Sequence, residues 1–207
     1  MQGLSKTNRQ MALSRKVNIM KNPTLLFALL LIFQTLFAVE SHVDSTKLNI
    51  VKFISDAPIE NIEGITNKID GYIYWDDDDV TAKSQMYFEI DLNSLDTGIG
   101  LRNRHMRDNY LETDKFPITW FKGKVVNLTK KTDSEFDLSA DGTIFIHGVE
   151  RPISVEGKMT KNDKSYRIQT NFEIELSDFN IKIPSLMFYK INETIKIELD
   201  FYVVTID

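Results

Sequence analysis

The chain of 207 residues contains no cysteine. Disulfides, thiolate metal ligands and a cysteine nucleophile are therefore excluded together. Histidine is scarce as well, and His42, His105 and His147 are too dispersed to give the spacing of a zinc site. The sequence also lacks the G-x-S-x-G turn of serine hydrolases, a phosphate-binding loop and a dinucleotide fingerprint. We therefore expect no metal, no cofactor and no catalytic residues.

A membrane-spanning run is missing too. The apolar run from Leu25 to Val39 is short for a bilayer span of about 20 residues. It follows a basic stretch and precedes polar sequence, which is the layout of a secretory signal peptide. We expect residues 1–41 to be a signal peptide, started at Met1 or Met20 and cleaved after Ser41. An uncleaved membrane anchor is the alternative interpretation.

The remaining domain, residues 42–207, is acidic. Residues 1–41 hold five basic side chains and one acidic side chain, so the rest has 20 basic and 29 acidic side chains, a net charge of −9. This balance argues against nucleic acid and anionic membrane surfaces as partners, because phosphate binding needs a basic face. The run Asp76–Asp79 lacks the ligand spacing of a calcium-binding loop. It is interpreted as a solvated hairpin turn, with a metal site as the alternative.

Hydrophobic residues alternate with polar ones from Lys47 onward. Apolar side chains fall on one face of residues 166–176 and charged or amide side chains on the other, which is typical of a half-buried strand. The same alternation predicts eight strands, near residues 47–55, 64–75, 80–91, 118–128, 135–147, 150–160, 165–176 and 194–205. Short connections favour antiparallel hairpins. The longer connection from Asn93 to Pro117 has room for one short helix around Leu101–Leu111.

Eight such strands form either a sandwich or a closed up-and-down barrel, and closure has the advantage of leaving no exposed edge. We predict an all-β, eight-stranded antiparallel barrel. The lumen of such a barrel is either filled by side chains or holds one small ligand, and the pattern does not separate these cases. The side chains predicted to line it are Phe88, Ile144, Ile174, Ile197 and Phe201. Those predicted to face water on the same strands are Glu89, Glu173, Lys196 and Glu198.

Basic residues gather in the long connection, outside the strand pattern. Arg102, Arg104, His105 and Arg107 lie within six residues of an otherwise acidic domain. Such a cluster can bind a phosphate or another polar head group, or it can form ion pairs at the surface. His147-Gly148, by contrast, is interpreted as a hairpin turn in which Gly148 takes a positive φ.

Three motifs in order give a resemblance to a known family. The first comprises Thr97-Gly98, Arg102-Asn103-Arg104-His105-Met106 and Lys115-Phe116-Pro117. The second runs from Gly142 to Pro152, and the third is Asp178-Phe179-Asn180-Ile181. Together they resemble the signature of the YceI-like polyisoprenoid-binding family, except that Asn103 stands where the family has Asp. The resemblance implies a lipocalin-like barrel, periplasmic or secreted, that holds an isoprenoid chain and has no established catalysis.

Three hypotheses for function follow. The first is an exported protein that binds an isoprenoid lipid, a quinone or a prenyl phosphate, with the head group at Arg102, Arg104 and His105. The second is a structural or stress-related exported barrel with a filled core and no ligand. The third is a redox partner that acts on a bound quinone, with His105 as the proton donor. A hollow lumen would favour the first and third hypotheses over the second.

Overall fold

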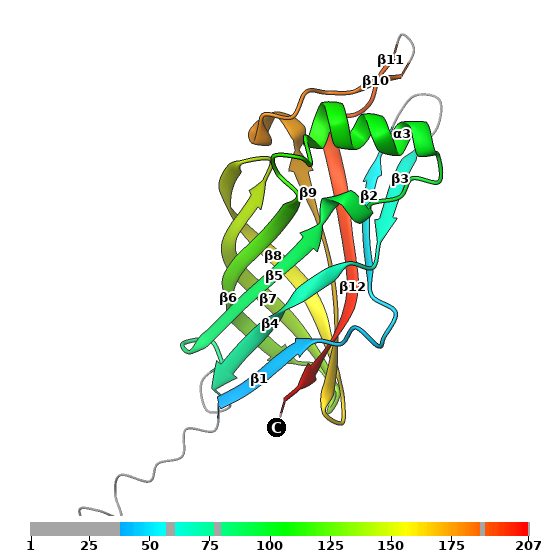
Figure 1. The fold of residues 1–207 in the computed structure, drawn as a ribbon. Helices are drawn as coiled ribbons and strands as arrows, with labels where there is room; N and C mark the ends of the chain where they lie inside the picture. Colours follow the sequence, from blue (N-terminus) through cyan, green and yellow to red (C-terminus); the bar gives the residue numbers. More distant parts are fainter. Residues whose placement is uncertain (1–37, 57–60, 77–79, 187–188, 207) are drawn as a thin grey trace, which may run out of the picture. The chain divides into compact units, whose positions relative to one another are not determined.

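The computed structural model describes residues 38–56, 61–76, 80–186 and 189–206 (Figure 1). Residues 1–37 of the predicted signal peptide and Asp77–Asp79 of the acidic run lie outside the described residues. Asp76 itself ends a strand, is buried, and forms an ion pair with Lys83 (Oδ2–Nζ distance 2.8 Å).

Eight strands form a closed antiparallel barrel, which confirms the predicted fold class. Around the barrel the order is β1 (Ala38–Val43), β4 (Ile69–Asp76), β5 (Ser84–Asp91), β6 (Ile118–Lys130), β7 (Glu135–Ile146), β8 (Val149–Asn162), β9 (Ser165–Glu175) and β12 (Thr194–Thr205). Pairing of β1 with β12 closes the ring, with Ser41 opposite Thr205 and Val43 opposite Val203. Closure pairs the edges that an open sheet would expose.

A hairpin of β2 (Ile50–Ser55) and β3 (Ile62–Thr66) extends the sheet beyond β1, along the other half of β12. The predicted strand 47–55 is thus shorter than expected, and a further strand, β1, precedes it. The predicted strand 64–75 is divided into β3 and β4. The division has a local cause, because the Lys68 amide donates to Thr66 Oγ1 (2.9 Å) and bends the chain between the two strands.

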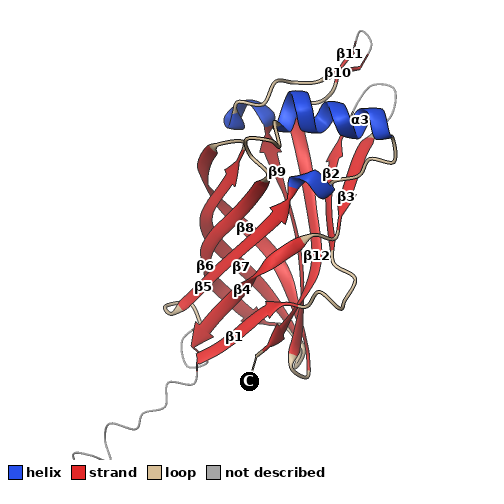
Figure 2. Cartoon of the chain, viewed as in Figure 1, coloured by secondary structure: helices blue, strands red, loops and turns tan. Residues whose placement is uncertain are grey.

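The helical elements lie at one end of the barrel, away from β1 (Figure 2). The predicted helix around 101–111 is confirmed as α3 (Gly100–His105), which continues into the π-helix η3 (Met106–Leu111). A short 3-10 helix, η2 (Leu92–Ser94), follows β5. The last long connection contains the 3-10 helix η4 (Leu176–Phe179) and the small hairpin of β10 (Ser185–Leu186) and β11 (Tyr189–Lys190).

Apolar side chains fill the barrel at the end near β1, which we call the packed end. It is built by Trp75, Val125, Met159, Tyr166 and Val203. The rings of Trp75 and Tyr166 meet edge to face with 5.2 Å between centroids, and Val203 is completely buried. Edge-to-face contact and full burial are features of a close-packed core. This part of the barrel therefore supplies a rigid base.

Candidate functional site

The lumen is hollow toward the helical end. It contains a cavity of about 580 Å³, within the usual range of small-molecule sites of about 300–1,000 Å³. All five side chains predicted to face the lumen line this cavity, namely Phe88, Ile144, Ile174, Ile197 and Phe201. Of the four residues predicted to face water, Glu173 and Lys196 are exposed, and Glu89 and Glu198 are partly exposed. The structure thus answers what the alternation left open, because the core is not filled.

The α3–η3 segment forms one wall of the cavity. Its residues that line the cavity are Leu101, Arg102, His105, Met106, Tyr110 and Leu111. The first two pairs of lining residues, Leu101–Arg102 and His105–Met106, are four positions apart. The third pair, Tyr110–Leu111, follows after five, because the π-helix has more residues per turn than an α-helix. From the sequence we predicted a role for the basic residues of this segment but not for its apolar stripe. Leu101, Met106 and Leu111 among polar neighbours were the available signal.

Arg102 and Asn103 organise the loop that leads into α3. The Arg102 guanidinium donates from Nε to Thr97 Oγ1 (2.9 Å) and from Nη2 to the Thr97 carbonyl (2.7 Å). Asn103 Oδ1 accepts hydrogen bonds from the Thr97 amide (2.8 Å) and hydroxyl (2.6 Å). Both side chains therefore stabilise the loop. Arg102 does so while lining the cavity.

The Asn at position 103 is explained by its neighbour Asp96. Asn103 Nδ2 donates to Asp96 Oδ1 (2.7 Å), and the Gly98 amide donates to the same oxygen (2.8 Å). The bond from Asn103, followed by the bond from Gly98, lowers the pKa of Asp96. An aspartate at position 103 would place a second carboxylate against Asp96. Asparagine therefore suits position 103 in this chain, because its amide donates a hydrogen bond to Asp96 where an aspartate would repel it.

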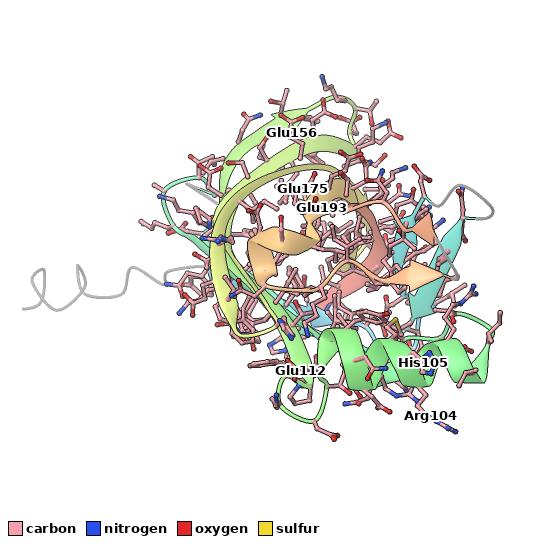
Figure 3. The ribbon with its side chains drawn as sticks, turned by 90° about the horizontal axis from the view of Figure 1, so that it is seen from above. Arg104, His105, Glu112, Glu156, Glu175 and Glu193 are labelled. Carbon is pink, nitrogen blue, oxygen red and sulfur yellow. The ribbon has the colours of Figure 1, made fainter. Side chains whose placement is uncertain are left out.

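The three residues of the predicted head-group site do not lie together. Arg102 and His105 line the cavity, whereas Arg104 is exposed and is not among the lining residues. Seen from above, Arg104 extends away from the barrel (Figure 3). The α-helical spacing explains this difference, because residues three positions apart share a face and the residue between them does not.

His147, in the turn between β7 and β8, connects the barrel to η3 and η4. At φ 50° it precedes Gly148 at φ 81°, which confirms the predicted positive φ of the glycine. His147 Nε2 lies 3.0 Å from Glu112 Oε2 at the end of η3, and Nδ1 lies 3.0 Å from the Phe179 carbonyl of η4. Lys115 first, and His147 second, lower the pKa of the Glu112 carboxyl through hydrogen bonds.

Both nitrogens of His147 face oxygen acceptors, so only a doubly protonated ring can donate to both at once. The His147 side chain is 9% exposed, and its ring meets Phe116 edge to face with 4.9 Å between centroids. We call this set of contacts, made by His147 with Glu112 and Phe179, the His147 clasp. Only the turn could be predicted from the sequence, because the partners of His147 lie 32 and 35 residues away.

The cavity wall offers few polar groups. Within the described ranges, no group of three His, Asp or Glu side chains is placed to hold a metal ion. The helices that the structure describes are all too short or too polar to span a membrane. One buried side-chain oxygen among the described residues, Ser55 Oγ, has no hydrogen-bond partner. The arrangement can therefore enclose an apolar molecule and exclude water from it.

Comparison with known proteins agrees with this architecture. The family model described as YceI-like domain matches residues 42–203. A UPF0312 protein of Yersinia pestis is 34% identical over 125 residues, which are 57% of this chain and 62% of that protein. The YceI protein of Shigella flexneri is 29% identical over 126 residues, 58% of this chain and 63% of that protein. The chain thus matches somewhat less than two thirds of the length of these curated relatives.

Solved structures show the same barrel at lower identity. Burkholderia cenocepacia BcnA has a TM-score of 0.64 and 16% identity, over 77% of this chain and 98% of that one. A polyisoprenoid binding domain from Saccharophagus degradans, implicated in plant cell wall breakdown, has a TM-score of 0.63 and 16% identity. That match covers 81% of this chain and 98% of the other. At such identity these likenesses support the fold.

Proposed function

Because the chain belongs to the YceI-like domain family, we propose that it binds one apolar isoprenoid lipid in the barrel lumen. The observation that carries the proposal is the apolar cavity of about 580 Å³ in the lumen, whose wall includes all five predicted lumen residues. A relative of the same fold is a polyisoprenoid binding domain. The lumen, the family and the fold of that relative support the same class of ligand.

The chain of such a lipid would supply most of the affinity. Each 100 Å² of apolar surface removed from water stabilises the complex by about 2.5 kcal/mol. This contribution has little chemical specificity, because the wall is built from Ile, Leu and Phe side chains that contact any apolar chain of suitable width. The polar end has to remain where donors are available, because an unpaired buried polar group costs several kcal/mol.

We place the head group, of a quinone or a prenyl phosphate, beside α3. His105 and Arg102 line the cavity there, and Tyr110 adds a hydroxyl one turn further along. His105 is the better candidate of the two basic residues, because two donors of Arg102 already bond to Thr97. Arg104 is the weakest of the three predicted residues, since it points away from the barrel (Figure 3).

We propose a binding protein rather than an enzyme. His105 is exposed and lines the apolar cavity, and within the described ranges it forms no hydrogen bond or ion pair with a second titratable side chain. General acid catalysis needs such a group to be positioned against the reacting atom. A filled scaffold without ligand is disfavoured by the hollow lumen. A redox partner that uses His105 as proton donor would lose turnover in His105→Ala.

Export completes the proposal, with the protein in the periplasm or secreted. We move the proposed signal-peptide boundary from Ser41 to a position before Ala38. Residues 38–41 pair with β4, and Ser41 is fully buried with its hydroxyl 3.1 Å from that of Thr205. Cleavage after Ser41 would remove most of the strand that closes the barrel. N-terminal sequencing of protein from the cell envelope tests this boundary.

The binding proposal is tested by two tryptophan substitutions on β9. Ile174→Trp places a large ring in the cavity, and Glu173→Trp places the same ring on the exposed outer face. With retinol, a fluorescent isoprenoid alcohol, we expect Ile174→Trp to lose most binding while its melting temperature is retained. Glu173→Trp should bind like the wild type. Retinol binding that is equal in both variants would contradict a ligand in the lumen.

A further inference from the structure

Strands β8 and β9 are hydrogen-bonded over only part of their length. Their pairing runs from Gly157 opposite Thr170 to Asn162 opposite Ser165. Beyond this point β8 remains paired with β7 as far as Val149, and β9 remains paired with β12 as far as Glu175. Residues 149–156 and 171–175 therefore face each other without a ladder. We call this gap the β8–β9 fork.

The fork begins at a side-chain hydrogen bond. Thr170 Oγ1 of β9 donates to the Glu156 carbonyl of β8 (2.6 Å), at the last paired position. The carbonyl of Glu156 thus points toward β9, and so do the backbone groups of every second residue further along β8. One of these is Pro152, which has no amide hydrogen to donate. In a continuous ladder this proline would remove a bond, whereas in the fork there is none to remove.

The other end of the fork is held by η4. Arg151 Nε donates to the Asp178 carbonyl (3.0 Å), and the neighbouring His147 contacts the Phe179 carbonyl. Between these two ends the gap is covered by side chains alone. Ile153 from β8 and Phe172 from β9 are half-buried and pack against the same apolar cluster.

The cavity extends to the fork. Its lining includes Val155 and Gly157 on β8, and Thr170 and Phe172 on β9. It also includes Glu156, an exposed residue that alternates with Val155 and Gly157 and therefore belongs to the outer face of β8. In the view down the barrel, Glu156 and Glu175 mark the two strands on this side (Figure 3). The cavity thus extends from the lumen to the strands on both sides of the fork.

We propose that the β8–β9 fork is a lateral portal through which the apolar chain of an isoprenoid lipid enters and leaves the lumen. Between paired strands of the barrel, passage would require ladder hydrogen bonds to break. At the fork the described strands have no ladder, and the gap is lined by the side chains of Ile153 and Phe172, whose change of rotamer is a fast motion. A chain longer than the cavity can also remain in the portal with its end outside. The inference rests on the proposed function.

The absence of cysteine allows the portal to be closed by design. Ser154→Cys with Glu173→Cys places one thiol on each arm of the fork, on exposed outward-facing residues. A short bis-maleimide linker then joins the arms, and mass spectrometry shows how much protein is linked. The matched control is Lys158→Cys with Gln169→Cys, a registered pair in the ladder below the fork. Both pairs lie outside the cavity lining.

Stopped-flow fluorescence with retinol gives the rates of uptake and release. We expect linking across the fork to slow both rates by about tenfold or more, because the route through the fork is then blocked and passage between paired strands requires ladder bonds to break. The equilibrium affinity should change little, and the linked control should exchange like the wild type. A second variant, Thr170→Val, removes the hydrogen bond to the Glu156 carbonyl at which the fork begins. This variant should take up and release retinol faster than the wild type.

Wild-type exchange rates in the linked fork variant would overturn the portal. Such a result would place entry elsewhere, for example beside Ile99 and Leu101, which are exposed and line the cavity. Equal slowing in the linked control would also overturn it, because the effect would then come from general stiffening. If the wild-type protein binds no retinol, the proposed function fails instead, so the two failures are distinguishable.

Discussion

The two ends of the barrel share the same strands and the same alternation of side chains, but only one of them is filled. At the packed end, Trp75, Tyr166 and Val203 meet in close contact. At the hollow end, Ile174 and Ile197 line open space and remain half-buried. The strand ladders also differ, since β8 and β9 are paired near the packed end and unpaired near the other. The comparison suggests that stability comes from one end of the barrel and binding from the other.

The largest expected difference between the ends is in stability. Trp75→Ala at the packed end should lower the free energy of unfolding by about 3–5 kcal/mol, because it removes a large buried ring and leaves a cavity. Ile174→Ala at the hollow end should cost less than about 2 kcal/mol, because its side chain already borders a cavity. Urea denaturation followed by circular dichroism measures both. Equal losses would mean that the hollow end is packed in solution.

The His147 clasp should have an intermediate effect. His147→Ala leaves the Phe179 carbonyl and the Glu112 carboxylate without their bonds to the ring, which should cost about 1–3 kcal/mol. The loss should appear locally, as faster hydrogen exchange in η3 and η4 than in the strands of the packed end. Hydrogen exchange that accelerates equally throughout the barrel would show that the clasp supports the whole fold and not only η3 and η4.

Ser55 should have a smaller effect of opposite sign. Its hydroxyl is fully enclosed in the wall of the hollow end and has no partner in the described part of the chain. Replacing it with alanine removes an unpaired buried polar group, so Ser55→Ala should raise the free energy of unfolding by about 1 kcal/mol. A thermal melt against the wild type measures the change. Destabilisation by this substitution would show that the hydroxyl has a partner in solution, such as a bound water.

The smallest expected effect is the pH dependence that comes from Glu112, whose carboxylate is bonded by Lys115 first and by His147 second. The pKa of Glu112 is lowered from its ordinary value of about 4.5, so its folded state favours the carboxylate. The stability that Glu112 contributes is fully present above that ordinary value and is lost as the pH falls through the lower, folded pKa. The melting temperatures of wild type and Glu112→Gln should therefore differ near neutral pH and converge in acid. A difference that persists at the lowest pH would contradict this role.

The sequence predicted the barrel, the inward residues and the glycine turn, because period-two alternation and turn chemistry are local signals. It left open whether the lumen is hollow, since alternation shows which side chains point inward but not whether their volumes fill the space. The strand β1 was missed because its first two residues belong to the apolar run, and residues 38–41 were assigned to the predicted signal peptide. The division between β3 and β4 was missed because the bend at Lys68 depends on a side-chain hydrogen bond to Thr66, which alternation does not reveal.

Only those parts of the candidate site that have a local signal in the sequence could be predicted. Arg102 and His105 were identified from composition and family resemblance, and both line the cavity. Arg104 was grouped with them because neighbours in sequence were treated as neighbours in space, which a helix does not allow. The β8–β9 fork and the His147 clasp depend on partners that only the folded chain brings together.

The most direct test of the account is to identify what occupies the hollow end. The full chain is purified from the cells that express it and extracted with organic solvent, and the extract is analysed by mass spectrometry beside that of the Ile174→Trp variant. The account predicts one apolar isoprenoid molecule per barrel from the wild type and little or none from the variant. An extract without any apolar molecule, from a wild-type protein that also takes up no retinol, would contradict it.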